Sequence, residues 1–498
     1  MMSEKAQLRQ GFDEQAKVKS DSERSGEPRS EKAPVEGGMI DRVQRTIRGD
    51  VSPGVVTNQN YESGQVTLQV LYLRLWRFPL LRGLLALAII TTFTQATTAQ
   101  NHDSYPRLQE YLQIAIEQNP ELQSMRVMVE SDRERVREAG VLMDPEISVA
   151  YDFNPMMSDS YLGRFSVSAM QMFPWFGSLE ARRDLQRSAV EANRSNVSSR
   201  QLEILRDVQL SWFDIAEIRE RIRVTEATLE LVRDLEKLVE ARYETGRAGQ
   251  ADILRIQMEE QRLKTRIAGL EDQLNPMKAL FNALLNREAQ AEVETAVEIH
   301  PRPVVWTEDV LGTLIRQQNP RFEGIAAERS GAENKRRIAK LDGRPGFGIG
   351  VEVMGRDFGP MSMFPDSRES IIGMATVRVP LFRSRYDSQK RQADYQIRSL
   401  DLQLEQTENR LMADLQSALE EIRSSERSSI LIEEELVPRA RQALRILSEE
   451  YATGSASFDE LLQIQRELLE LEFERVEAAV KHNKAVAKIE SLIGYSPP

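Results

Sequence analysis

The chain contains no cysteine among its 498 residues, which excludes disulfides, thiol catalysis and thiolate metal sites. Histidine is almost as rare: the three histidines lie far apart and show no ligand spacing. Aromatic residues make up only 6% of the chain and charged residues 29%. Because both charge signs are interspersed and the net charge is −12, the composition argues against nucleic acid as a partner. It is typical of long, solvated helices.

The sequence also lacks the residue patterns of an enzyme. No nucleophile stands beside a base, and the paired carboxylates have the spacing of solvated helix faces. The glycine-rich segment 346–350 opens a strand instead of linking a strand to a helix, so it does not predict a nucleotide-binding loop. We therefore expect no catalytic residue and no cofactor.

The N-terminal part of the chain does not read as folded structure. Residues 71–99 combine arginines, the apolar run 84–90 and small residues ending at Ala99, which predicts a secretory signal peptide. The apolar run is short for a bilayer span, so a permanent anchor is the weaker alternative. Residues 1–70 are polar and lack apolar periodicity, which indicates either a disordered extension or a start codon assigned too early.

The rest of the sequence repeats itself. Three motif pairs carry the repeat: Asn119-Pro120 with Asn319-Pro320, Pro174 and Phe176 with Pro380 and Phe382, and Tyr243-Glu-Thr-Gly246 with Tyr451-Ala-Thr-Gly454. We therefore divide the chain into a first repeat, 100–300, and a second repeat, 301–498. Repeats of this length are duplicated halves of a domain and not units of a solenoid.

Each repeat has a pair of strands. Apolar and polar residues alternate with a period of two over about 145–153 and 161–173, and again over about 347–354 and 370–380. Each strand therefore has one apolar face.

Each repeat also has a long helical hairpin. No proline or glycine interrupts Ser178 to Thr245, and a heptad pattern runs through this stretch, which predicts a coiled-coil helix about 100 Å long. The returning arm, 251–285, should be interrupted at Asn275-Pro276. The second long helix should run from about Tyr386 to Thr453, with a kink at Pro438.

Four strands on long helices cannot bury themselves in a monomer, and four strands cannot close a barrel. Strands with one apolar face suit lipid on one side and water on the other, so several chains should pool their strands. Over residues 104–496 the chain resembles the TolC outer-membrane efflux protein family. The resemblance rests on five features: the tandem halves, the helix break at Asn-Pro, the strand pairs, the segment 173–177 and the two Tyr-x-x-Gly turns.

The resemblance implies a mainly α fold with tandem-duplicated coiled-coil hairpins and four strands that contribute to a trimeric, twelve-stranded transmembrane β-barrel. It implies a bacterial outer-membrane location with a long periplasmic part, in contact with outer-membrane lipid. The function would be the exit duct of a tripartite efflux system for small solutes or metal ions. Its partners would be two further copies of the chain, a periplasmic adaptor (membrane fusion) protein and an inner-membrane pump of the RND type. The alternative is a periplasmic coiled-coil scaffold or adaptor without a pore.

The resemblance also points to the two helical turns, 243–254 and 451–462, as the periplasmic tips. The candidate adaptor-contacting residues are Tyr243, Gly246, Arg247, Tyr451 and Gly454. The two glycines allow a left-handed turn that other residues rarely adopt.

Acidic residues follow each turn and are candidates for a tunnel gate: Asp252 in the first repeat, and Asp459 with Glu460 in the second. Threefold symmetry would arrange them as rings of like charge, which attract cations. The alternative is ordinary capping of the returning helix.

Methionine is frequent in the strands and their loops. Thioethers are soft ligands that favour Cu(I), and the arrangement is similar to outer-membrane components of heavy-metal efflux. Met156, Met157, Met361 and Met363 are therefore candidate metal ligands. The alternative is that methionine fills irregular packing.

Overall fold

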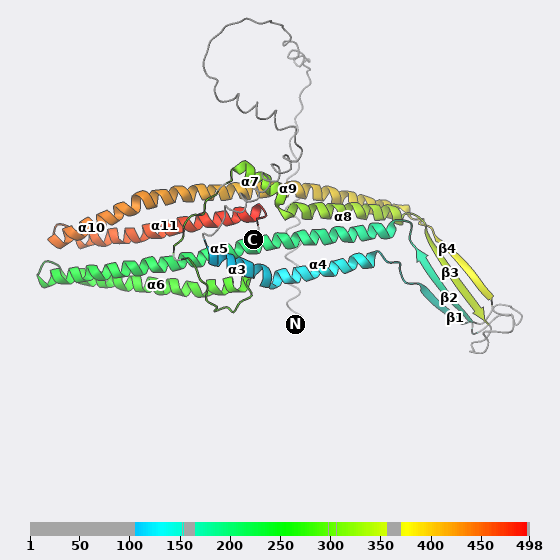
Figure 1. Ribbon diagram of the computed structural model, residues 1–498, viewed down its shortest axis with the longest axis horizontal. Helices are drawn as coiled ribbons and strands as arrows, with labels where there is room; N and C mark the ends of the chain where they lie inside the picture. The colour runs from blue at the N-terminus through cyan, green and yellow to red at the C-terminus, as the bar shows by residue number, and fades with distance from the viewer. Residues whose placement is uncertain are drawn as a thin grey trace, which may run out of the picture. The chain divides into compact units, whose positions relative to one another are not determined.

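A computed structural model describes residues 105–151, 153, 165–296, 298–304, 306–355 and 370–495. The predicted extension 1–70 and signal segment 71–99 lie outside the described residues. The described residues all belong to one compact unit, in which long helices lie side by side and a four-stranded sheet continues from one end (Figure 1). The predicted mainly α fold with a small β part is confirmed. In the described part of the chain, no helix combines the length and apolar character needed to cross a membrane.

An asparagine and a proline start the second helix of each repeat. α3 (Pro106–Gln118) precedes α4 (Pro120–Ala139), and α7 (Glu308–Gln318) precedes α8 (Pro320–Asp342). The Leu122 N–H donates to the Asn119 side chain at 3.1 Å, and the Arg321 N–H donates to the Asn319 side chain at 3.1 Å. Each proline takes the first helical position, where an N–H would have no helical partner. The helix breaks are therefore as predicted.

The first long hairpin consists of α5 (Ser178–Glu244), with 67 residues, and α6 (Gln250–Leu284), with 35 residues. Val208, Ile215 and Val232 of the heptad pattern are fully buried. The predicted interruption at Asn275-Pro276 is wrong, because α6 continues through Pro276. Its neighbours Leu274 and Met277 pack against the core around Trp212 of α5. Such packing can offset the helix-breaking tendency of proline, which costs about 3 kcal/mol.

The second long hairpin is less regular. α9 (Arg383–Ile430) passes into a π-helical turn (Leu431–Leu436) and then into α10 (Val437–Thr453), and α11 (Phe458–Leu492) runs back. The irregular turn ends just before Pro438, where we predicted a kink. Proline has no N–H and its ring collides with the carbonyl one turn earlier, so a widened turn relieves both problems.

The capping asparagines also join each helix pair to the end of its own hairpin. The Asn119 Nδ2 donates to the Leu284 carbonyl at 2.9 Å, and the Asn319 Nδ2 donates to the Leu492 carbonyl at 2.9 Å. The two repeats therefore share a tertiary contact as well as a sequence motif.

The four strands form one antiparallel sheet in the order β1-β2-β3-β4. Their bounds are Glu146–Tyr151 for β1, Phe165–Phe173 for β2, Gly346–Gly355 for β3 and Ser370–Arg378 for β4. β4 ends before the predicted residue 380, because Pro380 has no N–H for a ladder. Residues 161–164, which we predicted to begin the second strand, lie outside the described residues.

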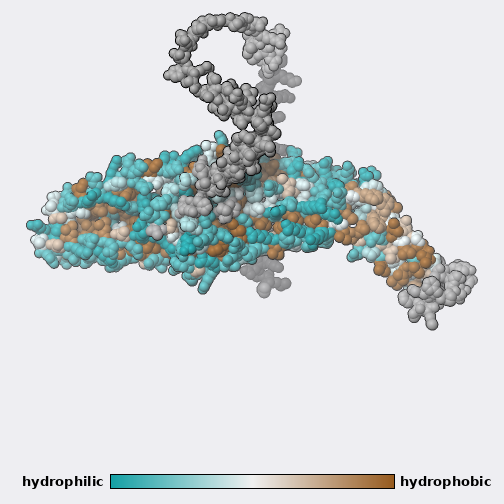
Figure 2. Space-filling model, viewed as in Figure 1, coloured by the Kyte–Doolittle hydropathy of each residue, from teal (hydrophilic) through white to brown (hydrophobic). Residues whose placement is uncertain are grey.

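The strand register separates the sheet into an apolar and a polar face, since residues paired across strands point to the same side. Val149, Val167, Val353 and Ile371 form one such row across all four strands. Glu146, Met170, Gly350 and Met374 form a row on the other face. The apolar face is uncovered: Ile147 is 69% and Ile371 74% exposed, and hydrophobic side chains gather over the sheet (Figure 2). An exposed apolar surface of this kind marks contact with lipid or another protein.

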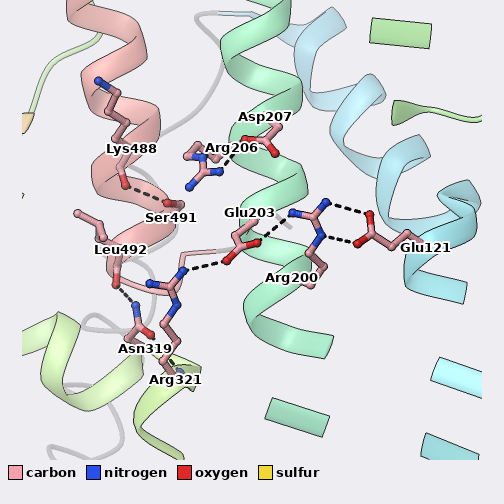
Figure 3. A network of polar contacts seen from close by, with 10 residues as sticks. All are labelled: Glu121, Arg200, Glu203, Arg206, Asp207, Asn319, Arg321, Lys488, Ser491 and Leu492. Carbon is pink, nitrogen blue, oxygen red and sulfur yellow. Dashed lines mark hydrogen bonds and ion pairs between the residues drawn. The ribbon is translucent and has the colours of Figure 1, made fainter. Parts of the chain in front are cut away.

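The sheet is connected to α4, α5, α8 and α9, and these helices pack side by side in the same order as the strands. A chain of ion pairs links three of these helices (Figure 3). Arg200 of α5 donates to both carboxylate oxygens of Glu121 at 2.7 and 2.9 Å, and to Glu203 at 3.0 Å. Glu203 in turn accepts from Arg321 of α8 at 2.8 Å. Hydrogen bonds from Arg200 lower the pKa of Glu121. Burial alone would raise the pKa of Glu203, but the two arginines outweigh it and lower that pKa.

Candidate functional site at the helical turns

Both predicted turns contain a glycine in the left-handed region. φ is +70° at Gly246 and +96° at Gly454, a conformation that disfavours residues with a Cβ. A Cβ on Gly246 would meet no atom within 4 Å, whereas one on Gly454 would lie 3.5 Å from the Arg242 guanidinium. At both glycines the backbone conformation therefore restricts the residue type, since 3.5 Å is an ordinary van der Waals contact.

Two of the three candidate gate residues cap the returning helices. The Gly249 N–H donates to the Asp252 carboxylate at 3.3 Å. The Ser457 N–H donates to the Glu460 carboxylate at 3.1 Å, and the Glu460 N–H donates to the Ser457 hydroxyl at 3.3 Å. This reciprocal pair is a capping box. Capping, which the sequence offered as the alternative role, is thus what Asp252 and Glu460 do within one chain.

The third candidate, Asp459, joins the two hairpins. Its carboxylate accepts from Arg255 of α6 at 2.6 Å. Farther from the turns, Glu259 accepts from the Arg466 Nε at 3.0 Å, and Arg266 pairs with Glu470 at 2.8 Å. Because these pairs all join α6 to α11, the two hairpins are held together by a ladder of charges.

The two equivalent tyrosines have opposite environments. Tyr243 is 45% exposed, whereas Tyr451 is 3% exposed and packs against the Phe458 ring. Burial raises the pKa of the Tyr451 phenol, and the Asp252 carboxylate raises it further. Tyr451 therefore offers little surface to a partner in this form of the turn.

Arg242 connects the two turns. Its guanidinium lies 4.2 Å from the centre of the Tyr451 ring and donates to the Tyr451 and Arg247 carbonyls, the latter at 3.0 Å. One arginine thus combines a cation–π contact with hydrogen bonds to both turns. We did not predict roles for Arg242, Arg255 and Arg466. Nothing in the sequence marks them, since each finds its partner in the other repeat.

The remaining candidates differ in accessibility. Arg247, Gly246 and Gly454 are exposed at the turns. Met156, Met157, Met361 and Met363 lie outside the described residues. The register places four other methionines, Met170, Met172, Met354 and Met374, on the polar face of the sheet. In the described part of the chain, no group of three or more histidine, aspartate or glutamate side chains could hold a metal ion.

Comparison with known proteins assigns the chain to a family. The model of the outer membrane efflux protein family matches residues 111–286 and 311–495. Nodulation protein T of Rhizobium leguminosarum biovar trifolii is 21% identical over 415 residues, which cover 79% of this chain and 86% of that protein.

Solved structures show the same fold. The outer membrane protein VceC of Vibrio cholerae superposes with a TM-score of 0.67 at 15% identity, covering 79% of this chain and 97% of VceC. The open-state MtrE outer membrane channel of Neisseria gonorrhoeae gives a TM-score of 0.63 at 14% identity, covering 78% of this chain and 89% of MtrE. Since the family model matches most of both repeats, the chain belongs to the outer membrane efflux protein family.

Proposed function

We propose that three copies of this outer-membrane protein form the exit duct of a tripartite efflux system. The observation that carries the proposal is the two-faced sheet at the end of the long helices. Its apolar face is uncovered and its polar face carries Ser148, Ser168 and Glu352, as expected for a wall between lipid and water. A sheet with free edges cannot remain in hydrocarbon, so β1 and β4 need partners from further copies.

The strand number agrees with a trimer. Four strands are too few for a barrel, and three copies together provide a closed ring of ordinary size. The helices α4, α5, α8 and α9 follow the strands in the same order. The same threefold closure would therefore continue the barrel as a helical tunnel into the periplasm.

The helical turns would be the periplasmic end of this tunnel. Tyr243, Gly246, Arg247 and Gly454 are exposed there and would contact a periplasmic adaptor, which in turn would connect the duct to an inner-membrane pump of the RND type. Tyr451 would act indirectly, because its buried ring supports Arg242 and hence both turns.

The contacts between the hairpins would form the gate. In this structure the Arg242 contacts with Tyr451 and the Arg255–Asp459 pair hold the second hairpin against the first. Opening would require these contacts to separate. Asp252, Asp459 and Glu460 would then form the like-charged rings that attract cations under threefold symmetry. Capping and gating can coexist, because a capping carboxylate keeps its negative charge.

The decisive experiment is purification of the full chain in a mild detergent. We expect a trimer that conducts ions in planar bilayers. A stable monomer that stays in solution without detergent would contradict the proposal and favour a periplasmic scaffold without a pore. A metal cargo bound by Met156, Met157, Met361 and Met363 remains a prediction from sequence.

A further inference from the structure

A hollow of about 600 Å³ lies where the sheet meets the helices. It is lined by the end of α4, the start of α5, the end of α8 and the start of α9, together with the adjoining ends of the strands. Three strand residues in the lining, Met172, Gly346 and Arg378, belong to the polar face by register, whereas the fourth, Phe173 at the end of β2, belongs to the apolar face. The hollow therefore lies at the end of the sheet, mainly toward its polar face.

Positive charge dominates the lining. The charged residues that line the hollow are Arg135, Arg182, Arg344, Arg378 and Arg385 against Glu138 and Asp342. Arg182 pairs with Asp342 at 3.2 Å, and Arg135 pairs with Asp132 at 2.7 Å.

The other three arginines have no carboxylate partner among the described residues: Arg344, Arg378 and Arg385 take part in none of the ion pairs there. Three arginines from three separate segments thus line one hollow, and none of them forms an ion pair within the described part of the chain. Such groups form charge-assisted, bidentate hydrogen bonds with carboxylates, sulfonates and phosphates.

An apolar wall accompanies these charges. Trp175, Met172, Leu341 and Tyr386 line the same hollow. The Arg344 guanidinium lies 5.2 Å from the centre of the Trp175 ring, so charge and aromatic surface are in contact. A site with convergent polar groups on a partly apolar wall suits a ligand with both kinds of surface.

We propose that this hollow binds small organic anions that carry an aromatic or other apolar group. We further propose that such anions belong to the cargo of the duct, and this second step rests on the proposed function. A lipid headgroup fits less well, because three of the four strand residues in the lining, Met172, Gly346 and Arg378, belong to the face opposite to the exposed apolar surface. In such a duct Arg344, Arg378 and Arg385 would place positive charge near the barrel. The acidic residues of the turns would place negative charge at the periplasmic end.

The first test is equilibrium dialysis of naphthalene-2-sulfonate against the full-length protein in a neutral detergent, with empty micelles as the blank. In the double variant Arg378→Gln/Arg385→Gln we expect about tenfold weaker binding, equivalent to about 1.4 kcal/mol. The matched control is Arg398→Gln/Arg427→Gln, which removes the same charge from two exposed arginines of α9 outside the hollow. The control should bind like the unmodified protein.

Three results would overturn the binding site: no binding above the blank, equal loss in both double variants, or equal affinity for the neutral analogue 2-naphthalenemethanol. The second test measures block of single-channel current by naphthalene-2-sulfonate in planar bilayers. Binding without block in a conducting channel would remove the anions from the cargo. Absence of any conductance would instead contradict the proposed duct, while the dialysis result would still decide whether the hollow binds anions.

Discussion

The two helical turns began as equivalent parts of a duplicated chain, yet they now have different structural roles. The first turn presents Tyr243 to solvent, whereas the second buries Tyr451 beneath Arg242. Arg242 comes from the first repeat, so the second turn depends on a side chain that its own repeat does not supply. The two turns share a left-handed glycine, whereas the environments of their tyrosines differ. The tyrosine of the first turn is exposed, and that of the second is buried against Arg242.

The largest difference should appear when the two tyrosines are truncated. Tyr451→Ala removes a buried ring and should destabilise the second turn by about 3 kcal/mol. Tyr243→Ala removes an exposed ring and should change local stability by no more than about 0.5 kcal/mol. Hydrogen exchange of residues 242–254 and 451–462 measures both effects. Equal protection in the two variants would show that the burial of Tyr451 does not anchor its turn.

The same pair of variants separates stability from partner binding. Tyr243→Ala should weaken binding of the adaptor while the turn remains protected from exchange. Adaptor binding can be measured with both proteins purified in detergent. If Tyr243→Ala binds the adaptor as well as the unmodified protein, this tyrosine is not a contact.

The glycines should give the next largest effect. Valine at either position must adopt a left-handed conformation, which costs about 1–2 kcal/mol. Gly454→Val should be the worse of the two, because its side chain also approaches Arg242. Both variants should impair efflux in cells without changing the amount of detergent-extracted trimer.

Asparagine provides the matched control for the glycines, since it tolerates a positive φ better than valine does. Gly246→Asn and Gly454→Asn should therefore retain most of the transport activity. Transport that is unchanged in both valine variants would show that the turn conformation is not needed for function.

The acidic residues should have smaller effects on stability and clear effects on current. Asp459→Asn breaks an exposed ion pair with Arg255, worth about 0.2–1 kcal/mol, and should ease opening. Glu460→Gln keeps a side chain that can complete the capping box but removes the charge. Both variants should relieve block by divalent cations applied at the periplasmic side in planar bilayers. Block of equal strength in all three proteins would leave Glu460 with capping alone.

The smallest effect concerns the chain of ion pairs that links α4, α5 and α8. The pKa values of Glu121 and Glu203 are lowered below the usual value of 4.5, so both carboxylates stabilise the fold above that pH. This contribution is lost as the pH falls through their lowered values. Thermal unfolding should therefore shift to lower temperature on acidification below about pH 4.5. In Glu121→Gln this shift should be smaller, and an identical pH profile would show that the Glu121–Arg200 pair contributes nothing measurable.

Much of the fold could be predicted from local patterns. Periodicity located the four strands and the long helices, and the Asn-Pro motifs located two helix starts, because each depends on neighbours in sequence. The prediction of a break at Pro276 failed for the converse reason. Proline weakens a helix locally, but packing of Leu274 and Met277 against α5 keeps α6 continuous.

The sequence by itself determined the duplication, the two-faced strands and the glycine turns, since these follow from local conformational preference and from spacing along the chain. Only the tertiary structure decided that Tyr451 is buried and Tyr243 exposed, that Asp459 meets Arg255, and that one hollow is lined by three arginines without a carboxylate partner among the described residues. These features join residues from different repeats or from distant segments. Their physical cause is packing between helices and strands. The pattern of residues along one segment does not predict which side chains of other segments will pack against it.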